Sequence, residues 1–304
     1  MPREKFGKGH DFLPKNEILT YEEIRNFVKA CKPLGLRKVR ITGGEPLLRQ
    51  DLHHLVRQLS AMEMEVALTT NGSLLENNAA NLAQSGLSRV TISLDAIDQE
   101  VHSKITDSKV PVIDILDGIS AATRYELGPV KVNCVVQRGV NEHQIPKLVR
   151  KFRGTGVIVR FIEFMDVGST NGWTQGQVVP TSEIIDFLSS EFDLTPLARK
   201  SASDVASRWA HSDGSGEIGF ISSVSQPFCG DCVRARLSSD GKFFTCLFTT
   251  IGHDMSALIR SGGNTEGLTL SIEEVWSARK DRYSEERSSG AISLPRLEMS
   301  YIGG

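Results

Sequence analysis

The chain has 304 residues, of which 39% are hydrophobic and 24% charged, as in an ordinary globular protein that can bury a substantial core. Its formal net charge of −2 argues against a general binder of nucleic acids or anionic membranes, and no apolar run approaches the roughly 18 residues of a membrane span. Residues 1–10 are charged and contain glycine, unlike a secretory signal. Of the five cysteines, three are clustered, which favours a reducing compartment, and we expect a cytoplasmic protein. The other two, Cys31 and Cys134, fall in apolar segments and are expected in the core.

The first two-thirds of the chain alternates short β-rich runs with amphipathic segments, which predicts βαβ units around a parallel sheet. Thr20 and Glu23 form a capping-box pattern that predicts a helix through about residue 30. We expect strands at residues 38–42, 66–70, 89–94, 130–136 and 157–164. We expect further helices at residues 51–62, 74–84, 113–125 and 143–152.

A turn-rich stretch at residues 168–176 predicts a domain boundary, with one domain over 1–168 and a second over 169–304. In the second part we expect helices at 184–192, 255–260 and 272–282, and short strands at 218–224 and 233–237. The predicted fold is therefore α/β, a parallel β/α barrel followed by a small C-terminal α+β region.

Polar motifs follow four of the predicted strands. They are Gly-Gly-Glu-Pro at 43–46, Thr-Thr-Asn-Gly at 69–72, Ser-Leu-Asp at 93–95 and Glu-Phe-Met-Asp at 163–166. In β/α barrels the carboxyl ends of the strands carry the active site. One such motif would be an ordinary turn, but four in succession favour a functional site.

Three cysteines near the C-terminal end, Cys229, Cys232 and Cys246, form the pattern Cys-x2-Cys-x13-Cys. Three thiolates can hold three irons of a cubane [4Fe–4S] cluster and leave the fourth iron open to another ligand. The alternatives are a structural zinc site, which usually needs a fourth ligand such as His211 or His253, and buried free thiols.

Three cations lie inside predicted strands of apolar character: Arg40, Lys131 and Arg160. On strands that line a barrel they would point into the lumen, which is unfavourable unless an anion balances them. This favours a polyanionic ligand, with Glu45 or Glu163 pairing some of the cations. The alternative is that these charges face solvent.

Arg234 and Arg236 lie between the clustered cysteines and alternate along a predicted strand, so they would share one face. Guanidinium groups suit phosphate, which indicates an anionic ligand next to the cluster. The alternative is a solvated strand edge.

Together these features resemble the family of GTP 3′,8-cyclases (MoaA proteins), which are radical S-adenosylmethionine (SAM) enzymes of molybdenum cofactor biosynthesis. The resemblance covers essentially the whole chain. Its most specific marks are residues 12–14, 40–49, 69–72 and 160–165, the cysteine triad with its Arg-Ala-Arg segment, and the terminal Gly-Gly.

The resemblance implies reductive cleavage of SAM to a 5′-deoxyadenosyl radical, which takes the 3′ hydrogen of GTP. The ribose carbon then attacks C8 of guanine to give (8S)-3′,8-cyclo-7,8-dihydroguanosine 5′-triphosphate. The implied SAM contacts are Gly44, Ser93 and Met165. The implied GTP contacts are Arg40, Thr69, Lys131, Arg160, Arg234, Ala235 and Arg236.

The resemblance also implies that the cluster on the three cysteines binds guanine at its open iron. The tail residues Gly303 and Gly304 would enter the active site. The implied consumer of the product is cyclic pyranopterin monophosphate synthase. The resemblance does not identify the electron donor, and it is compatible with a homodimer.

The family begins with a strand and Cys-x3-Cys-x2-Cys followed by Met-Pro, whereas this sequence begins at Met1-Pro2. We therefore expect Met1 to be an internal methionine of a longer protein, and the barrel of the 304-residue chain to lack its first strand and first cluster. The competing interpretations are a catalytically inactive GTP-binding relic with one cluster, and another radical SAM enzyme with an auxiliary cluster, such as a peptide-modifying one.

Overall fold

The computed structural model describes residues 13–168, 170–201, 204–262, 265–286 and 297–303. Most of the strands belong to one sheet: β1 (Lys38–Ile41), β2 (Glu65–Thr70), β3 (Arg89–Ser93), β4 (Lys131–Val136), β5 (Ile158–Glu163), β6 (Leu194–Leu197), β7 (Ser207–His211) and β8 (Glu217–Ile221). The spatial order of this eight-stranded sheet is β1-β2-β3-β4-β5-β8-β7-β6. A second sheet has the order β11-β10-β9 and consists of β9 (Arg236–Leu237), β10 (Lys242–Phe244) and β11 (His253–Asp254).

Helices alternate with the strands of the large sheet from α2 to α8, and the remaining α-helices lie after β11. The α-helices are α2 (Tyr21–Cys31), α3 (Leu52–Ser60), α4 (Leu75–Gln84), α5 (Gln99–Thr106), α6 (Val112–Arg124), α7 (Ile145–Phe152), α8 (Thr181–Ser189), α9 (Ser256–Arg260), α10 (Thr265–Ser277), α11 (Tyr283–Glu286) and α12 (Met299–Ile302). The 3-10 helices are η1 (Lys32–Leu34), η2 (Pro46–Leu48), η3 (Glu142–Gln144) and η4 (Gln175–Gln177).

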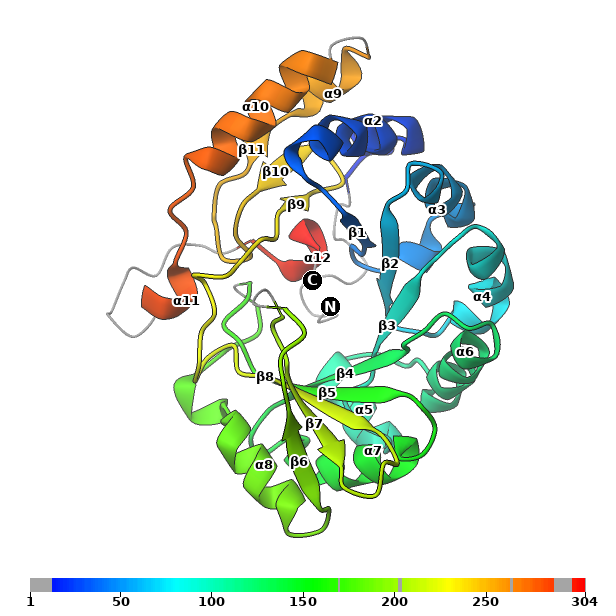
Figure 1. Ribbon diagram of the computed structural model, residues 1–304, viewed down its shortest axis with the longest axis vertical. Helices are drawn as coiled ribbons and strands as arrows, with labels where there is room; N and C mark the ends of the chain where they lie inside the picture. The colour runs from blue at the N-terminus through cyan, green and yellow to red at the C-terminus, as the bar shows by residue number, and fades with distance from the viewer. Residues whose placement is uncertain (1–12, 169, 202–203, 263–264, 287–296, 304) are drawn as a thin grey trace.

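The large sheet curves around a central space, with α2 to α8 on its outside and the short α12 inside the ring (Figure 1). Strands β1 to β5 and β8 are parallel, whereas β6 and β7 extend the sheet in antiparallel fashion. Because the carboxyl ends of parallel strands meet at one edge of a sheet, the loops after β1 to β5 and β8 gather at the same end. The predicted strands in the first 168 residues and the parallel sheet are confirmed.

Buried and half-buried residues alternate along β4, so the sheet has an apolar face toward the helices and a polar face toward the central space. Val132, Cys134 and Val136 are fully buried under the helices, while Lys131 and Asn133 alternate with them and face the central space. Cys134 therefore belongs to the core, as does Cys31 on α2, and both core predictions are confirmed.

The N-terminal helix α2 connects the sheet to the C-terminal region. Thr20 and Glu23 form the predicted capping box at its start. A second hydrophobic cluster, which includes Phe27, Phe243 and Ile272, packs α2 against β10 and α10. Residues from the two ends of the chain thus share one core, as the neighbouring α2, α9 and α10 in Figure 1 show.

Several elements differ from the sequence prediction. The prediction missed α5, β6, β7, β10 and β11, which are short or lie in stretches of mixed character. The segment predicted as a strand over residues 233–237 is extended only at its end, because β9 begins at Arg236. The predicted domain division at residue 168 stays a prediction, and the large sheet itself continues across it through β8.

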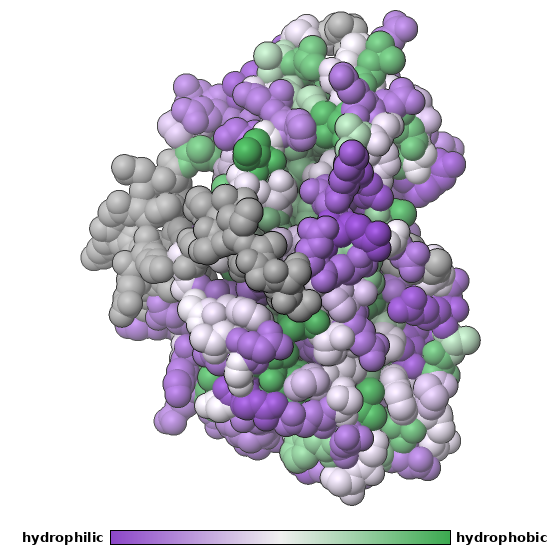
Figure 2. All heavy atoms as spheres, turned by 90° about the vertical axis from the view of Figure 1, so that its left-hand side faces the viewer, coloured by the Kyte–Doolittle hydropathy of each residue, from purple (hydrophilic) through white to green (hydrophobic). Residues whose placement is uncertain are grey.

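Hydrophilic side chains cover most of the coloured surface on the face shown in Figure 2, with apolar side chains in small groups between them. In the part of the chain that the structure describes, no helix is both long and apolar enough to cross a membrane.

Candidate functional site

A cavity of about 920 Å³ lies where the carboxyl ends of the parallel strands meet, a size typical of nucleotide and cofactor sites. Its walls come from the loops after β1, β2, β3, β5 and β8, from the segment between residues 228 and 248, and from the C-terminal tail. The lining includes many residues named from the sequence: Gly44, Thr69, Ser93, Met165, Cys229, Cys232, Arg234, Arg236 and Cys246.

The loop after β1 is fixed by Glu45, whose carboxylate binds the neighbouring loop. It accepts hydrogen bonds from Thr70 Oγ1 at 2.7 Å and from the backbone N–H of Asn71 at 2.8 Å. Gly43 has φ of 133°, a conformation that L side chains rarely adopt. These constraints hold the backbone of Gly44 open to the cavity, where a ligand can approach it closely.

Arg40 reaches from β1 across the inner wall of the sheet. Its Nη1 donates to Thr69 Oγ1 at 2.8 Å and to Thr91 Oγ1 at 3.2 Å. The Arg40 side chain is exposed to solvent, and these two threonines of β2 and β3 hold its guanidinium group. Burial lowers the pKa of Arg40, and repulsion from Arg89 and Arg234 lowers it further.

Lys131 and Arg160 continue this positive wall on β4 and β5. Arg160 Nε donates to Asn133 Oδ1 at 2.9 Å. Burial, followed by repulsion from Arg40 and Arg89, lowers the pKa of Arg160 to about 10. Burial, followed by repulsion from Arg160 and Arg89, lowers the pKa of Lys131 to about 8. The cations thus face each other without enough negative charge, and an anion in the lumen would relieve their repulsion.

Two further strand cations, Lys38 and Arg89, were missed from the sequence. Both pair with the Glu65 carboxylate, and Lys38 Nζ lies 3.4 Å from its Oε2. The sequence pattern could have identified them, because residues two apart on a strand share one face. Lys38 thus shares a face with Arg40, and Arg89 shares a face with Thr91.

The predicted pairing of Glu45 or Glu163 with these cations is wrong for the described residues. Glu163, at the end of β5, is completely buried and accepts hydrogen bonds from the backbone N–H groups of Thr181, Val224 and Ser225 at 2.7–2.8 Å. The Ser225 hydroxyl donates to it as well, at 2.5 Å. Backbone N–H groups and hydroxyls therefore supply the hydrogen bonds of both carboxylates, in place of the cations.

The three clustered cysteines are free, partly buried thiols on the wall of the same cavity. Burial alone would raise the pKa of Cys232, but the charges of Arg234 and Arg279 and the hydrogen bonds from Arg234 outweigh it, so this pKa is lowered. Burial raises the pKa of Cys246. The positive charges of Arg234 and Arg279 thus stabilise the thiolate form of Cys232 relative to the thiol.

The cluster, zinc and free-thiol hypotheses for these cysteines stay predictions. Among the described residues, no three His, Cys, Asp or Glu side chains come together closely enough to hold a single metal ion. A cubane makes no such demand, because each thiolate binds a different iron. Three thiols on one wall, with cations beside them, therefore fit a cluster by their donor type and their common cavity.

Arg234 and Arg236 do not share a strand face as predicted. Arg234 lies in the loop before β9, where its Nη2 is 3.5 Å from Cys232 Sγ and its guanidinium lies 5.2 Å from the centre of the Phe228 ring. Arg236 lies on β9, and its Nε donates to the Gly303 carbonyl at 3.1 Å. Both arginines nevertheless line the cavity, while Ala235 between them is exposed.

The C-terminal tail contributes to the wall of this cavity, and Figure 1 shows its helix α12 at the centre of the ring formed by the sheet. Glu298, Met299 and Ser300 contribute to the lining, and Gly303 lies against Thr42. Gly304 lies outside the described residues.

Asp95, in the loop after β3, also lines the cavity and was not selected as a site residue from the sequence. Its Oδ1 accepts a hydrogen bond from the Val135 N–H at 2.8 Å, and burial raises its pKa to about 6. The Ser-Leu-Asp motif was the available signal.

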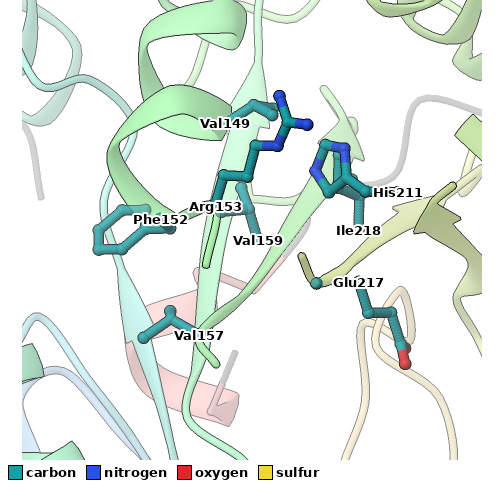
Figure 3. Close-up of a pocket in the computed structure, with 9 residues that line it drawn as sticks. Val149, Phe152, Arg153, Val157, Val159, His211, Glu217 and Ile218 are labelled. Atoms are coloured by element: carbon teal, nitrogen blue, oxygen red, sulfur yellow. The ribbon is translucent and has the colours of Figure 1, made fainter. Parts of the chain in front are cut away.

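A second cavity lies at the opposite end of β5 and β8. Figure 3 shows Arg153 and His211 at its edge and apolar side chains such as Val157 and Ile218 around it. Its volume of about 10 Å³ has room for one water molecule at most, so it is no site for a nucleotide.

Comparison with known proteins gives two consecutive family matches. Residues 6–152 match the radical SAM superfamily, and residues 157–285 match the family described as Molybdenum Cofactor Synthesis C. Proteins named GTP 3′,8-cyclase from Acidothermus cellulolyticus and Staphylococcus epidermidis are each 44% identical to this chain, over alignments that cover 100% of it and 91% of the relative.

Among solved structures, Streptococcus suis SuiB bound to S-adenosylmethionine aligns with a TM-score of 0.60 and 13% identity. The alignment covers 90% of this chain and 64% of SuiB. At this identity the likeness shows a shared fold.

Proposed function

This chain belongs to the GTP 3′,8-cyclase family of radical SAM enzymes, and we propose that it converts GTP into (8S)-3′,8-cyclo-7,8-dihydroguanosine 5′-triphosphate in molybdenum cofactor biosynthesis. One observation carries the proposal. A single cavity brings together the loops of a radical SAM fold, three clustered cysteines and an excess of cations. These features match the family, and SAM cleavage further requires a reduced cluster whose Cys-x3-Cys-x2-Cys ligands the 304-residue sequence does not contain.

The SAM side of the site lies on the loops after β1, β3 and β5. Gly44, Ser93 and Met165 contact SAM in this proposal, and all three line the cavity. Held with a reduced iron–sulfur cluster, SAM supplies the 5′-deoxyadenosyl radical that takes the 3′ hydrogen of GTP. The chain's own part is to hold the loop at Gly44 in one conformation, which Glu45 achieves through its bonds to Thr70 and Asn71.

The triphosphate side of the site is the positive inner wall. Arg40, Thr69, Lys131 and Arg160 bind GTP in this proposal, and they lie on strands β1, β2, β4 and β5 of one sheet, where Arg40 donates directly to Thr69. Their mutual repulsion favours a ligand with several negative charges over a neutral one. Arg234, Ala235 and Arg236 complete the GTP contacts from the opposite wall.

The guanine side of the site lies at Cys229, Cys232 and Cys246. These residues hold the [4Fe–4S] cluster in this proposal, with one iron left free for guanine. The product is a substrate for cyclic pyranopterin monophosphate synthase.

Turnover with labelled substrate tests the function. Protein expressed from its native locus and purified without oxygen is incubated with SAM, a reductant and GTP deuterated at C3′. We expect deuterium in the 5′-deoxyadenosine, together with a cyclised product of the mass of GTP. Turnover to 5′-deoxyadenosine without deuterium would contradict the proposed site of hydrogen abstraction.

Iron content and GTP binding complete the test. Two cubanes correspond to about eight irons per chain and one cubane to about four. GTP binding without any 5′-deoxyadenosine would favour the inactive relic, and absence of GTP binding would contradict the proposed substrate.

A further inference from the structure

The C-terminal tail docks on the same hairpin that carries Arg236. In this hairpin, β9 and β10 are antiparallel, and Arg236 lies opposite Phe244. The Tyr301 hydroxyl, on α12, donates to Asp240 Oδ2 at 2.7 Å and accepts from Lys242 Nζ at 3.1 Å. We refer to Tyr301, Asp240 and Lys242 as the tail latch.

Contacts within the hairpin orient Asp240, the hydrogen-bond acceptor of the tail latch. Asp240 Oδ1 accepts from the Ser238 hydroxyl at 2.5 Å, and its Oδ2 pairs with Lys242 Nζ at 3.2 Å. The carboxylate is therefore held in one orientation by local contacts, so docking of Tyr301 costs little further ordering of Asp240.

Apolar packing places the Tyr301 hydroxyl at this acceptor. The ring packs edge-on against Phe244, with ring centres 6.3 Å apart and planes at 82°. The next residue, Ile302, is only 1% exposed. The apolar contacts anchor the tail, and the hydroxyl fixes its register along the hairpin.

The far end of the tail reaches the site. Gly303 accepts from Arg236 Nε through its carbonyl at 3.1 Å, and its own N–H donates to Met299 at 2.9 Å. Its φ is 78°, and a Cβ there would lie 2.8 Å from Thr42 Cγ2. The chain after Tyr301 therefore has little freedom, so a shift of Tyr301 would move the Gly303 carbonyl.

We propose that Tyr301 is a positioning residue: through the tail latch it places the Gly303 carbonyl, which orients Arg236 for the anionic substrate. A guanidinium has five N–H donors in a fixed plane. Holding Nε on Gly303 sets the direction in which the remaining donors face the cavity. The inference relies on the proposed function only in naming GTP as the anion.

A double-mutant cycle tests this role. Tyr301→Phe removes the hydroxyl and keeps the ring on Phe244. We expect it to weaken GTP binding about fivefold, in line with the net contribution of one ordinary hydrogen bond. In an Arg236→Ala background the same change should have no further effect, because Tyr301 acts through Arg236. Tyr21→Phe is the matched control, because it removes a hydroxyl that donates to the Gln50 carbonyl outside the cavity.

A fivefold loss in both backgrounds would overturn the proposal, since a merely structural role would act independently of Arg236. Unchanged GTP affinity in Tyr301→Phe would overturn it as well. Amide hydrogen exchange over residues 299–303 gives a readout without ligand, and the tail latch predicts faster exchange in Tyr301→Phe than in wild type or Tyr21→Phe. Faster exchange in a protein that binds no GTP would reject the proposed function and support the tail latch, whereas unchanged exchange would reject the tail latch.

Discussion

Two regions carry the cations in and around the cavity, and they hold them in different ways. Arg40, Lys131 and Arg160 lie on strands β1, β4 and β5 of one sheet, so the backbone hydrogen bonds of the sheet set their positions. Arg234 and Arg236 project from a loop and a very short strand, where contacts with a thiol, an aromatic ring and the tail carbonyl set their positions. The sheet therefore fixes the backbone of the strand cations, whereas the orientation of the loop cations depends on remote segments.

The largest expected effect comes from the residue that joins these two regions. Glu163 ends β5 and binds Val224 and Ser225, in the segment that leads to Cys229. Glu163→Gln places an amide N–H₂ group against backbone donors and leaves buried groups unpaired. We expect the free energy of unfolding to fall by about 3 kcal/mol or more, measured by chemical denaturation, with less iron bound at the cysteines.

Glu183→Gln is the control for this change, because Glu183 makes an exposed ion pair with Arg138. It should change the free energy of unfolding by about 1 kcal/mol or less. Equal effects of the two substitutions would refute the linking role of Glu163.

The second prediction compares one cation from each region. Arg160→Met removes a half-buried strand cation that binds Asn133, and we expect GTP affinity to fall about 30-fold. Arg234→Ala removes an exposed loop cation, and we expect a loss of about fivefold, because solvent screens its charge more strongly.

Titration calorimetry of both variants with GTP and with SAM measures the difference. SAM affinity should stay near that of wild type in each. Unchanged GTP affinity in Arg234→Ala would argue against its assignment, and a larger loss there than in Arg160→Met would reverse the comparison between the regions.

The third prediction is a pH dependence confined to the strand region, with an effect smaller than that of Arg160→Met. Burial and neighbouring arginines lower the pKa of Lys131 to about 8. The triphosphate would favour the protonated amine and raise this pKa, so binding takes up a proton where free Lys131 is neutral. GTP affinity should therefore be nearly constant below the pKa and fall about tenfold between pH 7 and pH 9.

The measurement is GTP affinity across this pH range for wild type and Lys131→Met. The variant should bind more weakly at pH 7 and lose the decline toward pH 9. A decline of the same size in Lys131→Met would assign the titration to another group.

Local patterns in the sequence were sufficient to predict much of the molecule. The alternation of β-rich and amphipathic segments predicted the parallel strands β1 to β5, and the pattern at Thr20 and Glu23 predicted the cap of α2. Several site residues could also be predicted together, because loops after parallel strands meet at one end of a sheet and the motifs followed those strands.

Contacts between distant residues decided the rest. The pairing of β8 with β5, the backbone donors around Glu45 and Glu163, and the docking of Tyr301 on Asp240 join segments far apart in the chain. Periodicity in the sequence reports on neighbours within one element, so it contains no information about which distant donor or ring will meet a side chain. The sequence alone therefore predicted many of the groups that line the cavity, and only the tertiary structure decided how its loop-borne arginines and its tail are held, because that depends on packing between both ends of the chain.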